Sequence, residues 1–171
     1  MFEVGSYVVY GKEGVCKVES IGLSPVDGMD DGKMYYTLLP VYHEGVIYTP
    51  VDANVKIRAI VSRPDADKLI EGIRDTALDT FHNSNPRLTY QHYQELMTDN
   101  TSENLVYIIK SVYYKKSNLS PKKKLGQIDE KYCRLAEDML FGELAITMEK
   151  SKDEVKTLFE QAVLRTLFPE E

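Results

Sequence analysis

The sequence of 171 residues has no tryptophan, only two cysteines and no apolar run of membrane-spanning length. A transmembrane helix needs about 20 consecutive apolar residues, so no membrane span is expected. The opening residues, MFEVGSYVVYG, lack a basic region followed by an apolar stretch, so no signal peptide is visible. We therefore expect a cytoplasmic protein that has no membrane partner.

The two cysteines, Cys16 and Cys133, lie far apart in the chain. Neither has neighbouring cysteines or histidines at the spacing of a zinc or redox site. Free cysteine is among the most buried residue types, so we expect both to be buried apolar thiols.

Motifs of catalysis are also missing. The sequence contains no glycine-rich phosphate loop, no pair of histidines at helical spacing and no serine nucleophile motif. His43, His82 and His92 are isolated from one another, and a metal site would need further ligands. We predict a protein that is not an enzyme and has no metal, cofactor or small-molecule substrate. The alternative is an enzyme with an unrecognised carboxylate or histidine site.

Strand signals fill the first 61 residues. A polar loop at residues 24–32 and a turn with two glycines, Gly11 and Gly14, separate runs of β-branched and aromatic residues. Pro50 ends one of the runs because proline cannot donate to a strand ladder. The expected strands are residues 7–10, 15–21, 34–39, 46–49 and 55–60. Five short strands with frequent turns predict a small, strongly bent sheet or a partly open barrel.

Beyond residue 61 the apolar residues recur at the spacing of helices. Ser62 is the expected N-cap of the first helix, with Asp65 in its first turn. Pro86 opens a second helix, and a third covers residues 102–116. The predicted fold class is α+β in two modules, a β domain at residues 1–61 and an all-α bundle of about five helices at 62–171.

The last two helices are predicted from their caps. Ser120 and Pro121 have the residue types of an N-cap and a first helical position, so a fourth helix is expected to start there. Ser151 and Glu154 form a capping box before the final helix.

The charge is unevenly distributed. The net charge is −6, but residues 101–135 carry a net charge of +5. Lysines at the end of the third helix and the start of the fourth would meet at one corner. They are Lys110, Lys115, Lys116, Lys122, Lys123 and Lys124. A helix N-terminus disfavours cations but binds phosphate, so three lysines there point to phosphate contacts. The alternative is a solvated run of charge.

Three segments resemble the CarD/CdnL family. They are FEVGSYVVYGKEGVCKVESI, YTPVDANVKIRAI with Pro50, Val51 and Asp52, and SPKKKLGQIDEKYCRLAEDMLFGELAITM. The resemblance implies a Tudor-like head that binds the β subunit of bacterial RNA polymerase. It also implies a helical tail that contacts promoter DNA at the upstream edge of the transcription bubble and stabilises the open complex. Many relatives act at ribosomal RNA promoters. The resemblance also implies a cytoplasmic protein that associates with the bacterial nucleoid through RNA polymerase.

The resemblance also implies contact residues. A sheet edge can bind a partner by strand addition, and the candidate edge is Val46, Ile47, Tyr48 and Thr49. Relatives place polymerase-binding arginines near the positions of Ser24 and Tyr48.

DNA contacts are expected mostly with the backbone and without sequence specificity. Lys115, Lys124 and Arg87 fall at or near basic DNA-contacting positions of the family. The family's wedge tryptophan falls at about Asn85, beside Pro86, and this chain has no tryptophan. An apolar or aromatic wedge lowers the cost of unstacking a base step. The alternative is a polymerase-binding adaptor without direct DNA contact.

Overall fold

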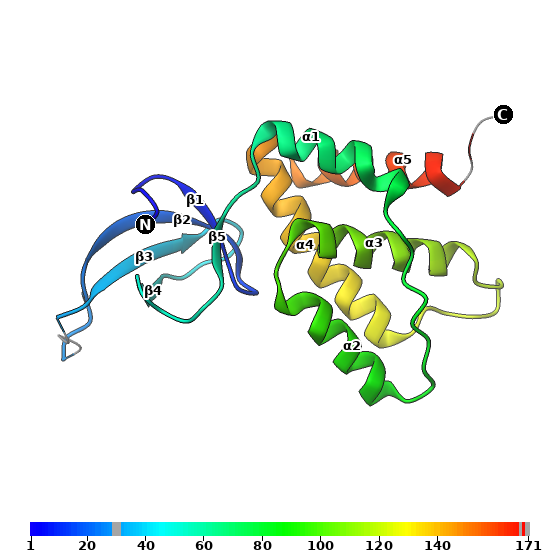
Figure 1. Ribbon diagram of the computed structural model, residues 1–171, viewed down its shortest axis with the longest axis horizontal. Coiled ribbons are helices and arrows are strands. Elements are labelled where there is room, and N and C mark those ends of the chain that lie inside the picture. Colours follow the sequence, from blue (N-terminus) through cyan, green and yellow to red (C-terminus); the bar gives the residue numbers. More distant parts are fainter. Residues whose placement is uncertain (29–31, 168, 170–171) are drawn as a thin grey trace. The chain divides into compact units, whose positions relative to one another are not determined.

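The computed structural model describes residues 1–28, 32–167 and 169, and it divides into two compact units, Met1–Ile60 and Val61–Glu171 (Figure 1). The first unit is an antiparallel sheet and the second is helical, which is the predicted α+β arrangement. Val61, expected at the end of the β domain, bonds within the helical unit. Its N–H donates to a Glu143 carboxylate oxygen at 2.9 Å, and its carbonyl accepts from the Thr147 hydroxyl at 2.9 Å.

The sheet unit has five strands among its described residues. They are β1 (Tyr7–Tyr10), β2 (Gly14–Leu23), β3 (Met34–Pro40), β4 (Ile47–Pro50) and β5 (Ile57–Ala59). All neighbours are antiparallel, in the order β4-β3-β2-β1-β5. The five predicted strands are therefore confirmed. Residues 29–31 of the predicted loop at 24–32 lie outside the described residues.

Two local features shape this sheet. Gly11 and Gly14 both have positive φ, +48° and +76°, so the tight turn between β1 and β2 depends on glycine. The register between β2 and β3 shifts between Val18 and Ser20, and such a bulge bends a strand. Cys16 is fully buried in the sheet core, as expected, and this burial raises the pKa of its thiol to about 11.

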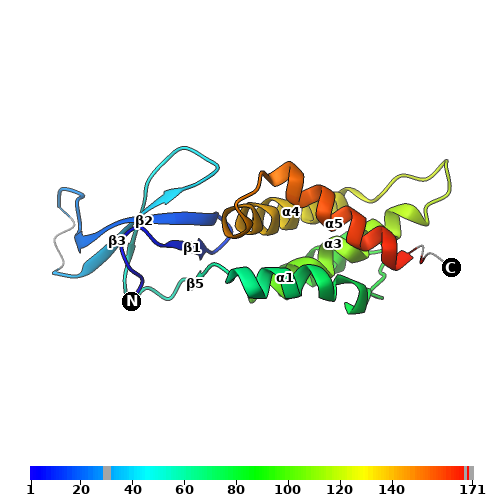
Figure 2. The same ribbon diagram turned by 90° about the horizontal axis from the view of Figure 1, so that it is seen from above.

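The helical unit contains one 3₁₀ turn and five α-helices among the described residues. They are α1 (Arg63–Glu71), η1 (Gly72–Asp75), α2 (Pro86–Thr98), α3 (Ser102–Ser117), α4 (Gln127–Met148) and α5 (Lys152–Leu167). α4 contacts all four other described α-helices and lies among them in Figures 1 and 2. No helix in the described part of the chain is long and apolar enough to cross a membrane.

Most predicted helix starts are confirmed. The Ser62 hydroxyl accepts the Asp65 N–H at 3.2 Å, and Pro86 opens α2. The capping box also forms, because the Ser151 N–H donates to Glu154 at 2.8 Å and the Glu154 N–H donates to the Ser151 hydroxyl at 3.1 Å.

The predicted start of the fourth helix at Ser120 and Pro121 is wrong. α4 begins at Gln127 with Gly126 as its N-cap, and residues 118–126 form a loop, which we call the α3–α4 loop. A helix from Pro121 would hold three lysines in its first turn, where the helix dipole disfavours cations, and Gly126 in its interior. The observed first turn instead carries Asp129 and Glu130, which the dipole favours.

Candidate nucleic-acid interface and sheet edge

β4 is an edge strand of the sheet, as predicted for this segment. It pairs with β3 in the register Leu38↔Ile47 and Thr37↔Tyr48, and no described strand lies on its other side. Thr49 is buried, Ile47 packs against the sheet core, and Tyr48 and the preceding Val46 are exposed. An unpaired strand edge offers backbone N–H and C=O groups to an extended partner segment.

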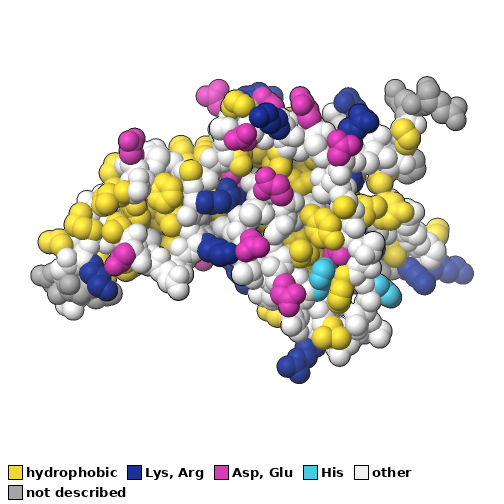
Figure 3. Space-filling view, in the orientation of Figure 1, with side chains coloured by type: hydrophobic (Ala, Val, Ile, Leu, Met, Phe, Trp, Pro, Cys, Tyr) yellow, Lys and Arg dark blue, Asp and Glu magenta, His cyan; other side chains and the backbone are white. Residues whose placement is uncertain are grey.

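Ser24 follows the end of β2 and is half-buried. Its hydroxyl accepts the Val26 N–H at 3.3 Å, so it stabilises its own turn. Leu23, Val26 and Met34 expose apolar side chains near this end of the sheet, and the register pairs Leu23 with Met34. Figure 3 shows apolar side chains gathered on the visible face of the sheet unit. Exposed apolar patches of this kind mark binding surfaces.

The α3–α4 loop concentrates positive charge at one end of the helical unit. Lys122, Lys123 and Lys124 are exposed in the loop, and Lys116 is exposed in the last turn of α3. Figure 3 shows Lys and Arg side chains at the end of the helical unit where this loop lies. The lysines do not lie at a helix N-terminus, so the predicted phosphate binding by helix N–H groups beside them does not apply.

Lys115 is partly exposed and occupied by an ion pair. Its Nζ lies 3.1 Å from Asp129 Oδ1, and the side chains are 38% and 13% exposed. The Tyr93 hydroxyl donates to the same carboxylate oxygen at 2.5 Å, and burial together with this bond raises the pKa of Tyr93. Lys115 is therefore held in place at the surface rather than freely mobile.

Lys110, expected in the basic corner, is buried instead. Its side chain is 2% exposed, and its ammonium group donates to the carbonyls of Ile73, Arg74 and Thr76 at 2.7, 3.1 and 2.6 Å. Burial lowers the pKa of Lys110. The prediction that Lys110 contacts DNA is incompatible with this position, because all three donors of the ammonium group are used inside the helical unit.

A basic groove of about 750 Å³ runs beside the α3–α4 loop. Its cationic lining residues are Lys116, Lys123, Lys124, Arg134 and Lys156. Sequence reasoning missed Arg134 of α4 and Lys156 of α5. Arg134 lies two turns beyond Gln127 on the same face of α4, and packing of α4 against α5 brings it to the groove that Lys156 also lines.

Carboxylates moderate the charge of the basic groove. Arg134 pairs with Glu130 at 3.3 Å, and both side chains are well exposed. Glu137 also lines the groove and accepts a hydrogen bond from the Tyr113 hydroxyl. Cys133 is buried as expected, and desolvation, followed by the negative charge of Glu137, raises the pKa of its thiol to about 12. A thiol with this pKa is not a nucleophile at neutral pH.

The start of α2 places the three residues of the expected wedge region on the surface. Asn85 is the N-cap, and its Oδ1 accepts the Arg87 N–H at 3.0 Å. The Asn85 N–H in turn donates to Asn83 Oδ1 at 2.8 Å. Asn85, Pro86 and Arg87 are all exposed. The positive end of the α2 dipole and a cationic side chain thus lie at one exposed tip.

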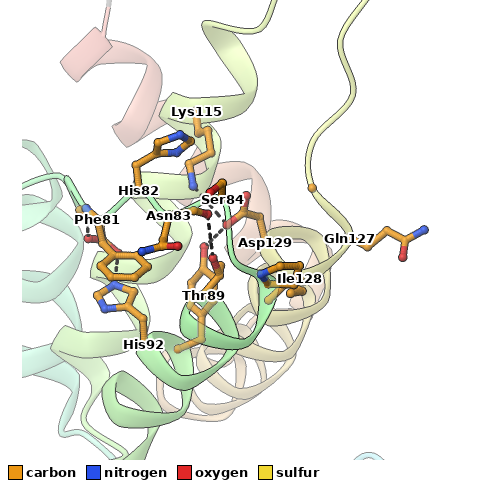
Figure 4. A pocket seen from close by; sticks show the side chains of 14 residues that line it. Phe81, His82, Asn83, Ser84, Thr89, His92, Lys115, Gln127, Ile128 and Asp129 are labelled. Atoms are coloured by element: carbon orange, nitrogen blue, oxygen red, sulfur yellow. Dashed lines mark hydrogen bonds and ion pairs between the residues drawn. The ribbon is translucent and has the colours of Figure 1, made fainter.

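A second cavity, which we call the α2 hollow, has a volume of about 380 Å³ and lies within the helical unit (Figure 4). Pro86 of α2, Lys115 of α3 and Asp129 of α4 line it together with the connection between η1 and α2. The structure therefore brings Pro86, next to the expected wedge position Asn85, and the expected DNA-contacting Lys115 to a shared cavity.

The connection that lines the α2 hollow is held by side chains. The Asp79 carboxylate lies 2.5 Å from His92 Nε2 and accepts the Phe81 N–H at 2.9 Å. The Phe81 ring stacks on His92 with ring centroids 4.1 Å apart, and the Asp79 N–H donates to the Ser111 hydroxyl at 2.8 Å. His92 thus has a structural role, because it holds Asp79 and Phe81 in place. Among the described residues, no group of three or more His, Cys, Asp or Glu side chains is arranged to hold a metal ion.

Residues 2–61 match the family model of the CarD-like/TRCF RID domain. This match covers the sheet unit from Phe2 onward and, apart from Val61, leaves the helical unit outside it. The domain family is non-catalytic, and the match supports an interaction with the β subunit of RNA polymerase. No curated protein matches the chain.

Proposed function

We propose that the chain is a bacterial transcription regulator that binds RNA polymerase and promoter DNA together, because residues 2–61 match the CarD-like/TRCF RID domain. The sheet unit binds the polymerase β subunit. The helical unit contacts DNA at the upstream edge of the transcription bubble and changes the lifetime of the open complex. The domain match is the observation that carries the proposal.

The edge strand β4 supports the polymerase contact. It pairs with β3 on one side only among the described strands, and the exposed side chains of Val46 and Tyr48 flank its open backbone. Strand addition supplies main-chain hydrogen bonds, and alternate side chains supply specificity. Ser24 and its apolar neighbours Leu23 and Val26 extend the candidate surface.

The lysines around the α3–α4 loop support the DNA contact. Lys116, Lys122, Lys123 and Lys124 are exposed, and Lys115 lies nearby on α3. Lysines are point charges that bind phosphate without reading bases, so binding is salt-sensitive and tolerant of sequence. At the α2 tip, Asn85, Pro86 and Arg87 meet the DNA where the strands separate.

A polymerase-binding adaptor without DNA contact is the second candidate. The presence of Glu130 and Glu137 beside the basic groove favours it, as does the net charge of −6. Carboxylates so close to the lysines weaken the attraction of the groove for a polyanion.

Replacing two loop lysines decides between the two candidates. Lys123→Glu with Lys124→Glu is expected to weaken promoter DNA binding in the complex with polymerase and to lower the slope of log K against log salt by about 2. The measurement is a salt titration of affinity with full-length protein and polymerase. Lys150→Glu is the matched control, since Lys150 is exposed between α4 and α5 and outside both cavities. An unchanged slope in the double variant would favour the second candidate, a polymerase-binding adaptor without DNA contact.

A further inference from the structure

The α2 hollow combines an aromatic wall with a cationic wall at the proposed DNA surface. Phe81, Pro86 and Ile128 provide apolar lining, and Lys115, His82 and Ser84 provide polar lining. We propose that this cavity binds one unpaired nucleotide of a DNA strand, with the base against the apolar wall and the phosphate toward Lys115. The inference rests on the proposed DNA contact and names the part of the DNA that the contact recognises.

The aromatic wall is prepared for stacking. The Phe81 ring lies parallel to the His92 ring within 10°, and His92 is fixed by Asp79, so the Phe81 ring is held in one orientation. Figure 4 shows this stacked pair on one side of the group of lining side chains. Unpaired bases stack on aromatic side chains, and every base has a face suited to this contact.

The cationic wall is equally fixed. Lys115 Nζ lies 3.1 Å from Asp129 Oδ1, and the Tyr93 hydroxyl donates to the same oxygen. These two donors offset the negative charge of Asp129, the carboxylate nearest to a bound phosphate. In the view of Figure 4, Lys115 and His82 are drawn above the stacked pair of Phe81 and His92. A ligand that is flat at one end and anionic at the other matches these two kinds of lining.

The size of the cavity and its position both fit a single nucleotide. About 380 Å³ is at the small end of ligand pockets, which span about 300–1,000 Å³. Pro86 lines the cavity, and its neighbours in sequence, Asn85 and Arg87, are exposed, so a strand that reaches the α2 tip meets a residue of the cavity wall. A base that is already unpaired has little unstacking left to lose. Capture of such a base holds separated strands apart without an inserted indole.

The test uses the full-length protein and a short duplex with one extrahelical 2-aminopurine, whose fluorescence falls when it stacks. The protein has no tryptophan, so the probe is read without indole emission. Two further arms carry the probe within a fully paired duplex and as the free mononucleotide. Duplex affinity is measured in parallel by anisotropy at low salt, which reports the proposed DNA contact separately.

Two variants and a control define the cavity. Phe81→Leu removes the ring but keeps apolar bulk, and Ser84→Leu places bulk at an exposed lining position. Gln91→Leu introduces the same residue on the exposed face of α2, where Gln91 bonds to Glu95 at 3.1 Å away from the cavity. Melting curves show whether each variant folds.

We expect quenching of the extrahelical probe, and we expect about tenfold weaker binding of that probe by both cavity variants. Gln91→Leu should behave as the unchanged protein.

If duplex affinity is retained but the extrahelical probe is quenched no more than the paired one, the inference is wrong and the proposed DNA contact stands. Quenching of the free mononucleotide at equal affinity also overturns it, because the cavity then binds a free nucleotide. If the unchanged protein binds none of the duplexes at low salt, the proposed DNA contact is wrong as well as the inference.

Discussion

At the scale of single residues, two buried side chains with ionisable groups, Glu143 and Lys110, organise the helical unit. Glu143 is fully buried and accepts the Val61 N–H at the start of this unit. Lys110 closes the carbonyl end of η1 through its three hydrogen bonds. Buried ionised groups are tolerated when their hydrogen-bonding capacity is filled. Neither role is visible in the sequence, because burial of Lys110 depends on where η1 ends, more than thirty residues earlier in the chain.

Replacing Lys110 tests its structural role. Lys110→Met keeps the length of the side chain but removes three donors and leaves three carbonyl groups without them. We expect the free energy of unfolding of the helical unit to fall by about 2–4 kcal/mol. Chemical denaturation followed by far-UV circular dichroism measures it. Lys68→Met on the exposed face of α1 is the control, with an expected change within about 0.5 kcal/mol. Equal stability of the two variants would contradict the assignment.

At the scale of elements, local signals predicted most of the structure. The strand runs, the caps at Ser62 and Ser151, and Pro86 at the first position of α2 were sufficient, because each depends on neighbours within a few residues. The predicted helix start at Ser120 was wrong because serine followed by proline also occurs commonly in turns. The positive charge of the next three residues also opposes a helix start. The groove residues Arg134 and Lys156 were missed because they come together only through packing of α4 and α5.

The two serines give a matched pair of variants. Ser151→Ala removes one half of the capping box of α5 and is expected to cost about 1 kcal/mol of stability. Ser120→Ala should be neutral, since Ser120 lies in the α3–α4 loop and caps no helix. The comparison is made from the denaturation midpoints of the helical unit. A loss for Ser120→Ala as large as that for Ser151→Ala would show that a helix starts at Pro121 in solution.

At the scale of the whole molecule, two units of different construction carry two different kinds of candidate contact. The sheet unit offers an open strand edge and exposed apolar side chains, which suit a protein partner. The helical unit offers exposed lysines and a cavity, which suit a polyanion. A substitution that weakens one of these contacts should therefore leave the other contact unchanged.

Tyr48→Glu tests this separation. A carboxylate on the exposed side of β4 should lower affinity for the polymerase β subunit about tenfold while leaving low-salt DNA binding by the free protein unchanged. Binding is measured by interferometry with purified polymerase. Val4→Glu introduces the same charge at an exposed residue elsewhere in the sheet unit and should have little effect. Unchanged polymerase affinity in Tyr48→Glu would remove β4 from the contact.

The shortness of β4 has a consequence for the protein before it meets a partner. An open strand edge is a site where copies of a chain can aggregate, and natural sheets limit this danger with short edge strands and with proline. β4 has four residues and ends at Pro50, so it has both protections. The same features leave few backbone groups for a partner to pair with. Tight association at this edge must then draw on side chains such as Tyr48, which makes the edge selective as well as resistant to self-assembly.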